Sequence, residues 1–298
     1  MALTINHNMM AMDAARNLSN SYSALATSTR RLSSGLRVNT ASDDAAGLAV
    51  REIMRAEISS LNQGVRNAND AISMIQTADG ALGVIDEKLI RMKELAMQAS
   101  TGTYSSDQRL IIDSEYQAMA SEITRIANAT DFNGIHLLNG NLSGATSSHN
   151  GSSLTSTGPL KVHFGTGNDS SEDYYYVSIN NATASALGVG QGTASTDGKS
   201  ISTQTLAQSA LEQLDKAIIS KDKIRANLGA LQNRLQNTIT NLGIQAQNTQ
   251  AAESQISDVD VATEMTTFTR NQILTQSAVA MLSQANGLGK LALQLIGG

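Results

Sequence analysis

The sequence predicts a mainly α-helical protein: a long antiparallel helical bundle or coiled-coil rod with a small β insert. The first observation behind this prediction is composition. The 298 residues include one proline, Pro159, and only 3% aromatics, so the apolar volume comes mostly from Ala, Leu, Ile, Val and Met. Proline is the strongest helix breaker and alanine the best helix former, so such a chain can sustain very long helices. The second observation is spacing, because apolar residues recur in alternating steps of three and four, the heptad pattern of helices that pack on helices.

Both ends of the chain carry a heptad seam. The amino-terminal seam consists of Ala11, Ala15, Leu18, Tyr22, Leu25, Thr29, Leu32 and Leu36, and the carboxy-terminal seam of Leu274, Ala278, Met281, Ala285, Leu288, Ala292 and Leu295. Ordering a tail of this length costs about 1–2 kcal/mol per residue, whereas full burial of a large seam residue returns about 1.5–3 kcal/mol. We therefore expect the carboxy-terminal tail to fold only when neighbours cover several of its faces, since pairing with the amino-terminal seam alone would leave much apolar surface exposed.

The middle of the chain predicts two further long helices, a shorter one and a β insert. A helix over residues 44–99, with Ser42 or Asp43 as its N-cap, precedes a third helix that opens with the capping-box spacing of Ser105 and Gln108. Short strands are expected within residues 132–140, 161–164 and 174–179, the last two joined as a hairpin. Helical spacing returns over residues 202–252, and the segment 256–264 interrupts it.

This organisation predicts three domains. Residues 1–43 plus 255–298 form a terminal coiled-coil domain, residues 44–140 plus 200–254 form a helical rod, and residues 141–199 form a short outer insert. The stretch 143–157 is rich in Ser and Thr and could accept O-linked sugars, although a plain flexible loop fits it better.

Motifs for catalysis, metals and nucleic acids are missing from the sequence. The chain has no cysteine, its four histidines are scattered without ligand spacing, and its net charge of −5 does not suit a nucleic-acid partner. The segment 287–290 fails the phosphate-loop pattern, and no nucleophile elbow occurs. Polar residues interrupt the apolar tail too often for a membrane span, and the amino terminus does not fit a cleavable secretory signal. The sequence therefore predicts a protein that is not an enzyme and binds no cofactor; if it leaves the cell, it does so by a route other than a cleavable secretory signal.

Four stretches of the sequence resemble bacterial flagellins. They are LSSGLRVNTASDDAAGLAV at residues 32–50, NQGVRNANDAISMIQTADGAL at 62–82, DFNGIHLLNG at 131–140 and the closing QANGLGKLALQLIGG. The resemblance implies a structural subunit that polymerises into the helical flagellar filament for motility, with the terminal helices paired as a coiled coil in the filament core. It also implies unfolded secretion by the flagellar type III route and, as partners, an export chaperone, a cap protein and hook-associated proteins. A hook–filament junction protein with similar terminal seams is the alternative.

The resemblance further implies a Toll-like innate immune receptor of the host as a partner. The residues that match the family's receptor-contact pattern are Arg91, Leu95, Gln98 and Glu115. Ile90 and Lys93 depart from related sequences, which puts the potency of this chain as a receptor ligand in question.

Overall fold

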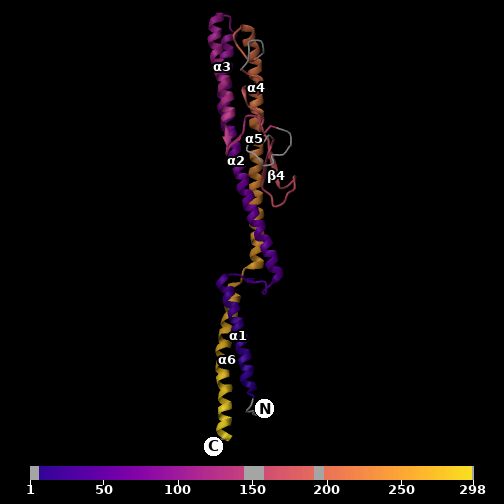
Figure 1. The fold of residues 1–298 in the computed structure, drawn as a ribbon, viewed down its shortest axis with the longest axis vertical. Coiled ribbons are helices and arrows are strands. Elements are labelled where there is room, and N and C mark those ends of the chain that lie inside the picture. Colours follow the sequence, from indigo (N-terminus) through magenta and orange to yellow (C-terminus); the bar gives the residue numbers. More distant parts are fainter. Residues whose placement is uncertain (1–6, 144–157, 191–197, 297–298) are drawn as a thin grey trace. The chain divides into compact units, whose positions relative to one another are not determined.

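The structure is a computed structural model that describes residues 7–143, 158–190 and 198–296, without the side chains of residues 288–296. Within these residues the chain is mainly helical, as predicted, and its strands form two small two-stranded sheets (Figure 1). The residues group into two compact units, which are described one at a time. Unit 1 comprises Met1–Ile58 and Gln247–Gly298, and unit 2 comprises Ser59–Ala246. The predicted division into three domains stays a prediction.

Unit 1 is built on the two terminal helices, α1 (Met9–Ser34) and α6 (Val261–Ile296), which lie side by side in Figure 1. The helices are antiparallel. At one end the Asn8 amide donates to the Ala285 carbonyl at 2.9 Å, and at the other the Arg31 guanidinium lies 3.7 Å from the Glu264 carboxylate. The predicted pairing of the terminal helices is confirmed.

A short connection ties the other end of α1 to the segment before α6. Helix α1 ends at Gly35, whose φ of 73° is the left-handed conformation that glycine adopts without steric cost. The chain then pairs with the end of α5 (Gln204–Ser257), because the Arg37 amide donates to the Ser257 carbonyl at 2.7 Å and Leu36 forms a β-bridge with Asp258. Helix α2 (Ala45–Ser100) follows, capped by Asp44, whose carboxylate accepts from the Gly47 amide at 2.9 Å. The predicted cap, Ser42 or Asp43, was therefore one or two residues early.

Unit 2 contains a continuous hydrophobic core shared by α2, α3 (Ser106–Ala129), α5 and the insert. Helix α3 opens with the predicted capping box, in which the Ser105 and Gln108 side chains each accept from the other residue's amide. Apolar residues at heptad spacing on these helices supply the core: Leu61, Ala68, Ile72, Ile75, Ala78, Leu82, Ile85, Leu89, Met92, Ala96 and Ala99 from α2, Tyr116 and Ile123 from α3, and Leu214, Ala217, Ile224, Leu228, Leu235 and Leu242 from α5.

Three ion pairs link α2 to α5 beside this core. Asp79 pairs with Arg225 at 2.7 Å, Asp86 with Lys221 at 2.6 Å, and Lys93 with Asp215, so the sign of the charge on α2 reverses at the last pair. The positions on α2 are seven residues apart and therefore lie along one face of the helix. Lys221 is only 2% exposed, and its ammonium group also contacts the Asp222 carboxylate at 2.7 Å.

The β insert packs against α2 through its second hairpin. The first hairpin joins β1 (Asp131–Phe132) to β2 (Ile135–His136). The second pairs β3 (Leu160–His163) with β4 (Tyr174–Val177), and this is the hairpin that the sequence predicted. Gly64 of α2 lies so close to the Phe164 carbonyl that a Cβ atom there would be 2.0 Å from the oxygen. The short helix α4 (Ala184–Leu187), which follows β4, was not predicted.

Candidate functional site

The candidate functional site lies on the outer apolar faces of α1 and α6. The outer apolar faces consist of the large apolar side chains of the two helices that are exposed in the described structure: Met9, Met10, Met12 and Tyr22 of α1, and Val261, Met265, Ile273, Leu274, Val279 and Met281 of α6. They face away from the contact between the two helices. A soluble protein rarely leaves so many large apolar side chains exposed along one pair of helices unless they bind something.

The predicted seam of α1 divides between this outer face and the contact with α6. Ala11, Leu18, Leu25 and Leu32 are half-buried, whereas Tyr22 is exposed. The less exposed positions between the four are Ala14, Ser21 and Ser28, one residue before the predicted Ala15, Tyr22 and Thr29. These small side chains let the helix backbones approach closely, and Cα atoms of α1 and α6 come within 8 Å of each other.

The predicted seam of α6 divides in the same way. Ala278 is half-buried and Ala285 is buried, but Leu274 is 48% and Met281 62% exposed. Thr275 and Leu282, each one residue later, take the places of the exposed pair. The side chains of Leu288 and Leu295 lie outside the described residues. The heptad pattern predicts one seam on α6. It therefore missed Met265, Ile273 and Val279, which are not part of that seam.

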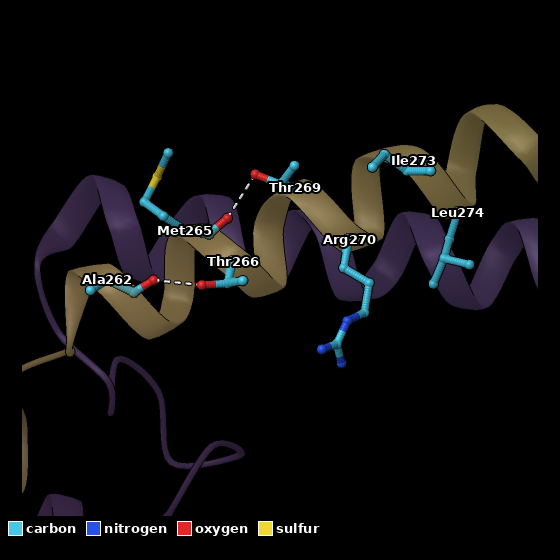
Figure 2. A pocket seen from close by; sticks show the side chains of 7 residues that line it. All are labelled: Ala262, Met265, Thr266, Thr269, Arg270, Ile273 and Leu274. Atoms are coloured by element: carbon cyan, nitrogen blue, oxygen red, sulfur yellow. Dashed lines mark hydrogen bonds between the residues drawn. The ribbon is translucent and has the colours of Figure 1, made fainter.

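The outer apolar face of α6 begins with a shallow open groove on the first turns of the helix (Figure 2). Its lining residues are Ala262, Met265, Thr266, Thr269, Arg270, Ile273 and Leu274. The two hydroxyls are already used within the helix, since Thr266 donates to the Ala262 carbonyl at 2.8 Å and Thr269 to the Met265 carbonyl at 2.9 Å. Chemically, the groove therefore offers apolar contact and one cation.

Polar groups fix the start of α6. The Asp260 carboxylate accepts from the Ala262 amide at 3.0 Å and from the Thr263 hydroxyl at 2.6 Å, and these bonds, the hydroxyl first, lower the pKa of Asp260. Nearby, Arg31 and Glu264 pair loosely across the two helices, and one buried atom of each, Nε and Oε1, has no hydrogen-bond partner among the described residues. The contact between α1 and α6 is thus partly polar, whereas their outer faces are apolar.

The predicted receptor residues lie in unit 2, and the structure brings three of the four to the surface of α2 and α3. The Arg91 guanidinium bonds the Glu115 carboxylate at 2.9 and 3.1 Å and the Glu94 carboxylate at 3.0 Å, and these two carboxylates raise the pKa of Arg91. Gln98 is exposed and donates to the Tyr104 hydroxyl at 3.0 Å. Leu95 is different: it is 1% exposed inside the core, because its position on α2 faces that core.

In the part of the chain that the structure describes, no group of three or more His, Cys, Asp or Glu side chains could hold a metal ion. No described helix is both long and apolar enough to cross a membrane.

A pair of antiparallel terminal helices with apolar outer faces, joined in sequence to a helical unit with a closed core, defines a structural subunit of helical assemblies. Comparison with known families gives the particular class. Residues 5–143 match the bacterial flagellin N-terminal helical region, and residues 211–296 match the bacterial flagellin C-terminal helical region. The chain belongs to the bacterial flagellin family. Flagellins are structural proteins of the flagellar filament and not enzymes.

Individual relatives support this assignment over nearly the whole chain. The flagellar filament 33 kDa core protein of Treponema phagedenis is 42% identical over 99% of this chain and all of that protein. A flagellin of Halalkalibacterium halodurans is 40% identical with the same coverage. Among solved structures, a putative flagellar hook-associated protein from Vibrio parahaemolyticus has a TM-score of 0.55 and 15% identity, covering 72% of this chain and all of that one, which shows likeness of fold alone.

Proposed function

We propose that copies of this chain polymerise into the helical flagellar filament by burying the outer apolar faces of α1 and α6 between subunits. The observation that carries the proposal is the exposure of these faces in a single chain. Ile273, Leu274, Val279 and Met281 are about half exposed, so burying the rest of these side chains would contribute roughly 3–6 kcal/mol, half of the ~1.5–3 kcal/mol each that burial from water gives. No comparable gain is available to the isolated subunit, whose own helix pairing uses the opposite faces.

Symmetry explains why such a contact would build a filament. The outer faces of α1 and α6 are different surfaces, so a contact between one face of a subunit and another face of its neighbour is heterologous. A heterologous contact that does not close into a ring propagates as an open helix. Secretion through the flagellar type III route, with an export chaperone, and growth beneath a cap protein at the extracellular tip belong to the same proposal.

Removal of the terminal helices tests this proposal. A fragment of residues 44–254 keeps the core of unit 2 and lacks α1 and α6, so we expect it to be soluble, helical and unable to polymerise. The full chain, seeded under the same conditions, should form long filaments in electron micrographs. Filaments of the fragment would show that the terminal faces are not the assembly surface.

A hook–filament junction protein is the second candidate. What favours it is the likeness of fold to the putative hook-associated protein of Vibrio parahaemolyticus. The two candidates differ in the length of the homopolymer. A junction protein should stop at short assemblies when purified subunits are seeded, whereas a filament subunit should grow into long filaments.

We also propose that the exposed face with Arg91, Gln98 and Glu115 is a ligand for a Toll-like receptor of the host. The Arg91–Glu115 pair supports this, because it presents a fixed array of donors and acceptors across α2 and α3. In a receptor reporter assay, Arg91→Ala and Gln98→Ala should each weaken the response of cells to the chain. Equal responses to the variants and the unchanged chain would contradict this assignment.

A further inference from the structure

The methionines of the chain are divided between the core and the terminal helices. The chain contains 11 methionines and neither cysteine nor tryptophan. Met74 and Met92 are buried in unit 2. Five others are at least 47% exposed on the outer apolar faces of unit 1: Met9, Met10, Met12, Met265 and Met281. In unit 2, Met97 has a similar exposure, which makes it a natural control.

This distribution matters because the thioether of methionine is readily oxidised. With no thiol in the chain, no cysteine competes for an oxidant, and exposure decides which methionines react. The product, methionine sulfoxide, replaces a flexible apolar side chain with a polar one and disrupts surfaces that bind through methionine. The reaction is reversible by methionine sulfoxide reductases.

We propose that these five methionines are oxidation sites through which a two-electron oxidant such as hydrogen peroxide blocks assembly of the free subunit. A sulfur lone pair attacks one peroxide oxygen, an S–O bond forms as the O–O bond breaks, and the other oxygen leaves as water after proton transfer. The sulfur is oxidised by two electrons, and the peroxide is reduced by the same two. This inference rests on the proposed function, since it assigns a chemical control to the surface that the proposal buries between subunits.

The surroundings of Met265 explain why a sulfoxide would act against assembly. Figure 2 shows Met265 projecting from α6 on the groove that also contains Thr266 and Thr269. Both hydroxyls already donate to helix carbonyls, so among the lining side chains of the groove only Arg270 could donate to a sulfoxide oxygen, and Figure 2 shows it projecting away from Met265. A buried acceptor without a donor weakens association by about tenfold or more for each such group. The helix should keep its fold, because Met265 is 47% exposed and is not one of the core residues.

The order of oxidation and assembly should change the outcome. In the free subunit the five thioethers are open to the oxidant, whereas in the assembled filament they are covered by neighbouring copies. Oxidant added before assembly should therefore prevent growth, and the same oxidant added afterwards should modify these positions far more slowly.

The experiment uses the full chain in three preparations: unchanged, with all five methionines replaced by leucine (Met9→Leu, Met10→Leu, Met12→Leu, Met265→Leu and Met281→Leu), and with Met97→Leu alone. Leucine keeps the apolar volume and cannot form a sulfoxide. Each preparation is treated with hydrogen peroxide as monomer, mapped by mass spectrometry for sulfoxides and then seeded. We expect at least a tenfold rise in the critical concentration for the unchanged chain and for Met97→Leu, and no rise for the fivefold variant. Treatment with methionine sulfoxide reductases should restore growth.

The outcomes separate this inference from the proposed function. If the untreated chain does not polymerise, the proposed function fails first. If the untreated chain polymerises and the oxidised chain grows equally well, or the fivefold variant is as sensitive as the unchanged chain, the oxidation sites are wrong while the assembly proposal stands.

Discussion

The two units of this flagellin use their apolar side chains in opposite ways. In the described residues, every buried hydrophobic side chain except Val38 and Ala285 belongs to unit 2. Unit 1 has helices of similar apolar content, but places most of its large apolar side chains outside and puts Ala14, Ser21, Ser28 and Thr275 between the helices. A continuous core of packed residues is what gives a unit independent stability. The comparison teaches that unit 2 has the core it needs to fold as a single copy, whereas unit 1 lacks one and, in the proposed assembly, completes it with neighbours.

A charge on the outer face of α6 should separate the two units most sharply. Leu274→Asp places a carboxylate in the groove, and burying it there costs desolvation that the nearby Arg270 cation does not fully offset. We expect no filaments at concentrations at which the unchanged chain assembles, together with an unaltered thermal unfolding midpoint of the monomer. Sedimentation of seeded samples and circular dichroism measure the two quantities.

The matched control for this change is Leu274→Ile, which keeps an apolar side chain of the same size and should assemble normally. Assembly by the aspartate variant at the normal concentration would remove α6 from the interface and cancel the contrast between the units.

The reverse experiment breaks unit 2 and concerns Lys221. Its ammonium group is buried between the Asp86 and Asp222 carboxylates, so removing both with Asp86→Ala and Asp222→Ala leaves a buried charge without a partner. We expect the free energy of unfolding to fall by about 3–5 kcal/mol, as for other buried pairs that lose one side. Urea denaturation of the monomer gives this value.

Lys221→Met serves as the control, since it removes the buried charge and leaves two carboxylates that water can reach; the side chains of Asp86 and Asp222 are 28% and 60% exposed. Lys221→Met should lower the free energy of unfolding clearly less than the double alanine variant does. Equal losses of stability would mean that the loss of the ion pairs, which both variants share, destabilises the unit, and not a buried charge left without a partner.

How far the sequence predicts this molecule depends on what kind of contact sets each feature. Helix ends are set by local contacts, so the capping box of Ser105 and Gln108 was predicted from residue types alone. Whether Ser21 or Tyr22 contacts α6 could not be predicted from the sequence, because both positions fit a heptad and only the close approach of α6 favours the small side chain.

Long-range packing hid other features from the sequence. Lys221 occupies a core position of α5 between Ala217 and Ile224, and nothing in its local sequence predicts that α2 supplies Asp86 as its partner. The outer apolar faces were predicted only in part, because the heptad pattern gives a single seam on α6. The helix is apolar on more than one side, with Ile273 and Val279 exposed beside Leu274.

The smallest expected effect lies inside unit 2, at Tyr116. Its buried hydroxyl donates to the Gly198 carbonyl at 2.7 Å, so Tyr116→Phe should lower the free energy of unfolding by about 0.5–1.5 kcal/mol near neutral pH. Burial, and secondarily the charge of Asp113, raises the pKa of Tyr116. An unfolded tyrosine loses its proton near a pH of about 10, while the folded one keeps it. The stabilisation from Tyr116 is therefore fully present below that pH and is lost as the pH rises further. Urea denaturation at two pH values should show that the stability advantage of tyrosine over phenylalanine shrinks in alkali, and an advantage that grew instead would contradict the assignment. Seeded assembly at neutral pH should be the same for both chains, because Tyr116 is remote from α1 and α6 in sequence and is buried in the core of the other unit.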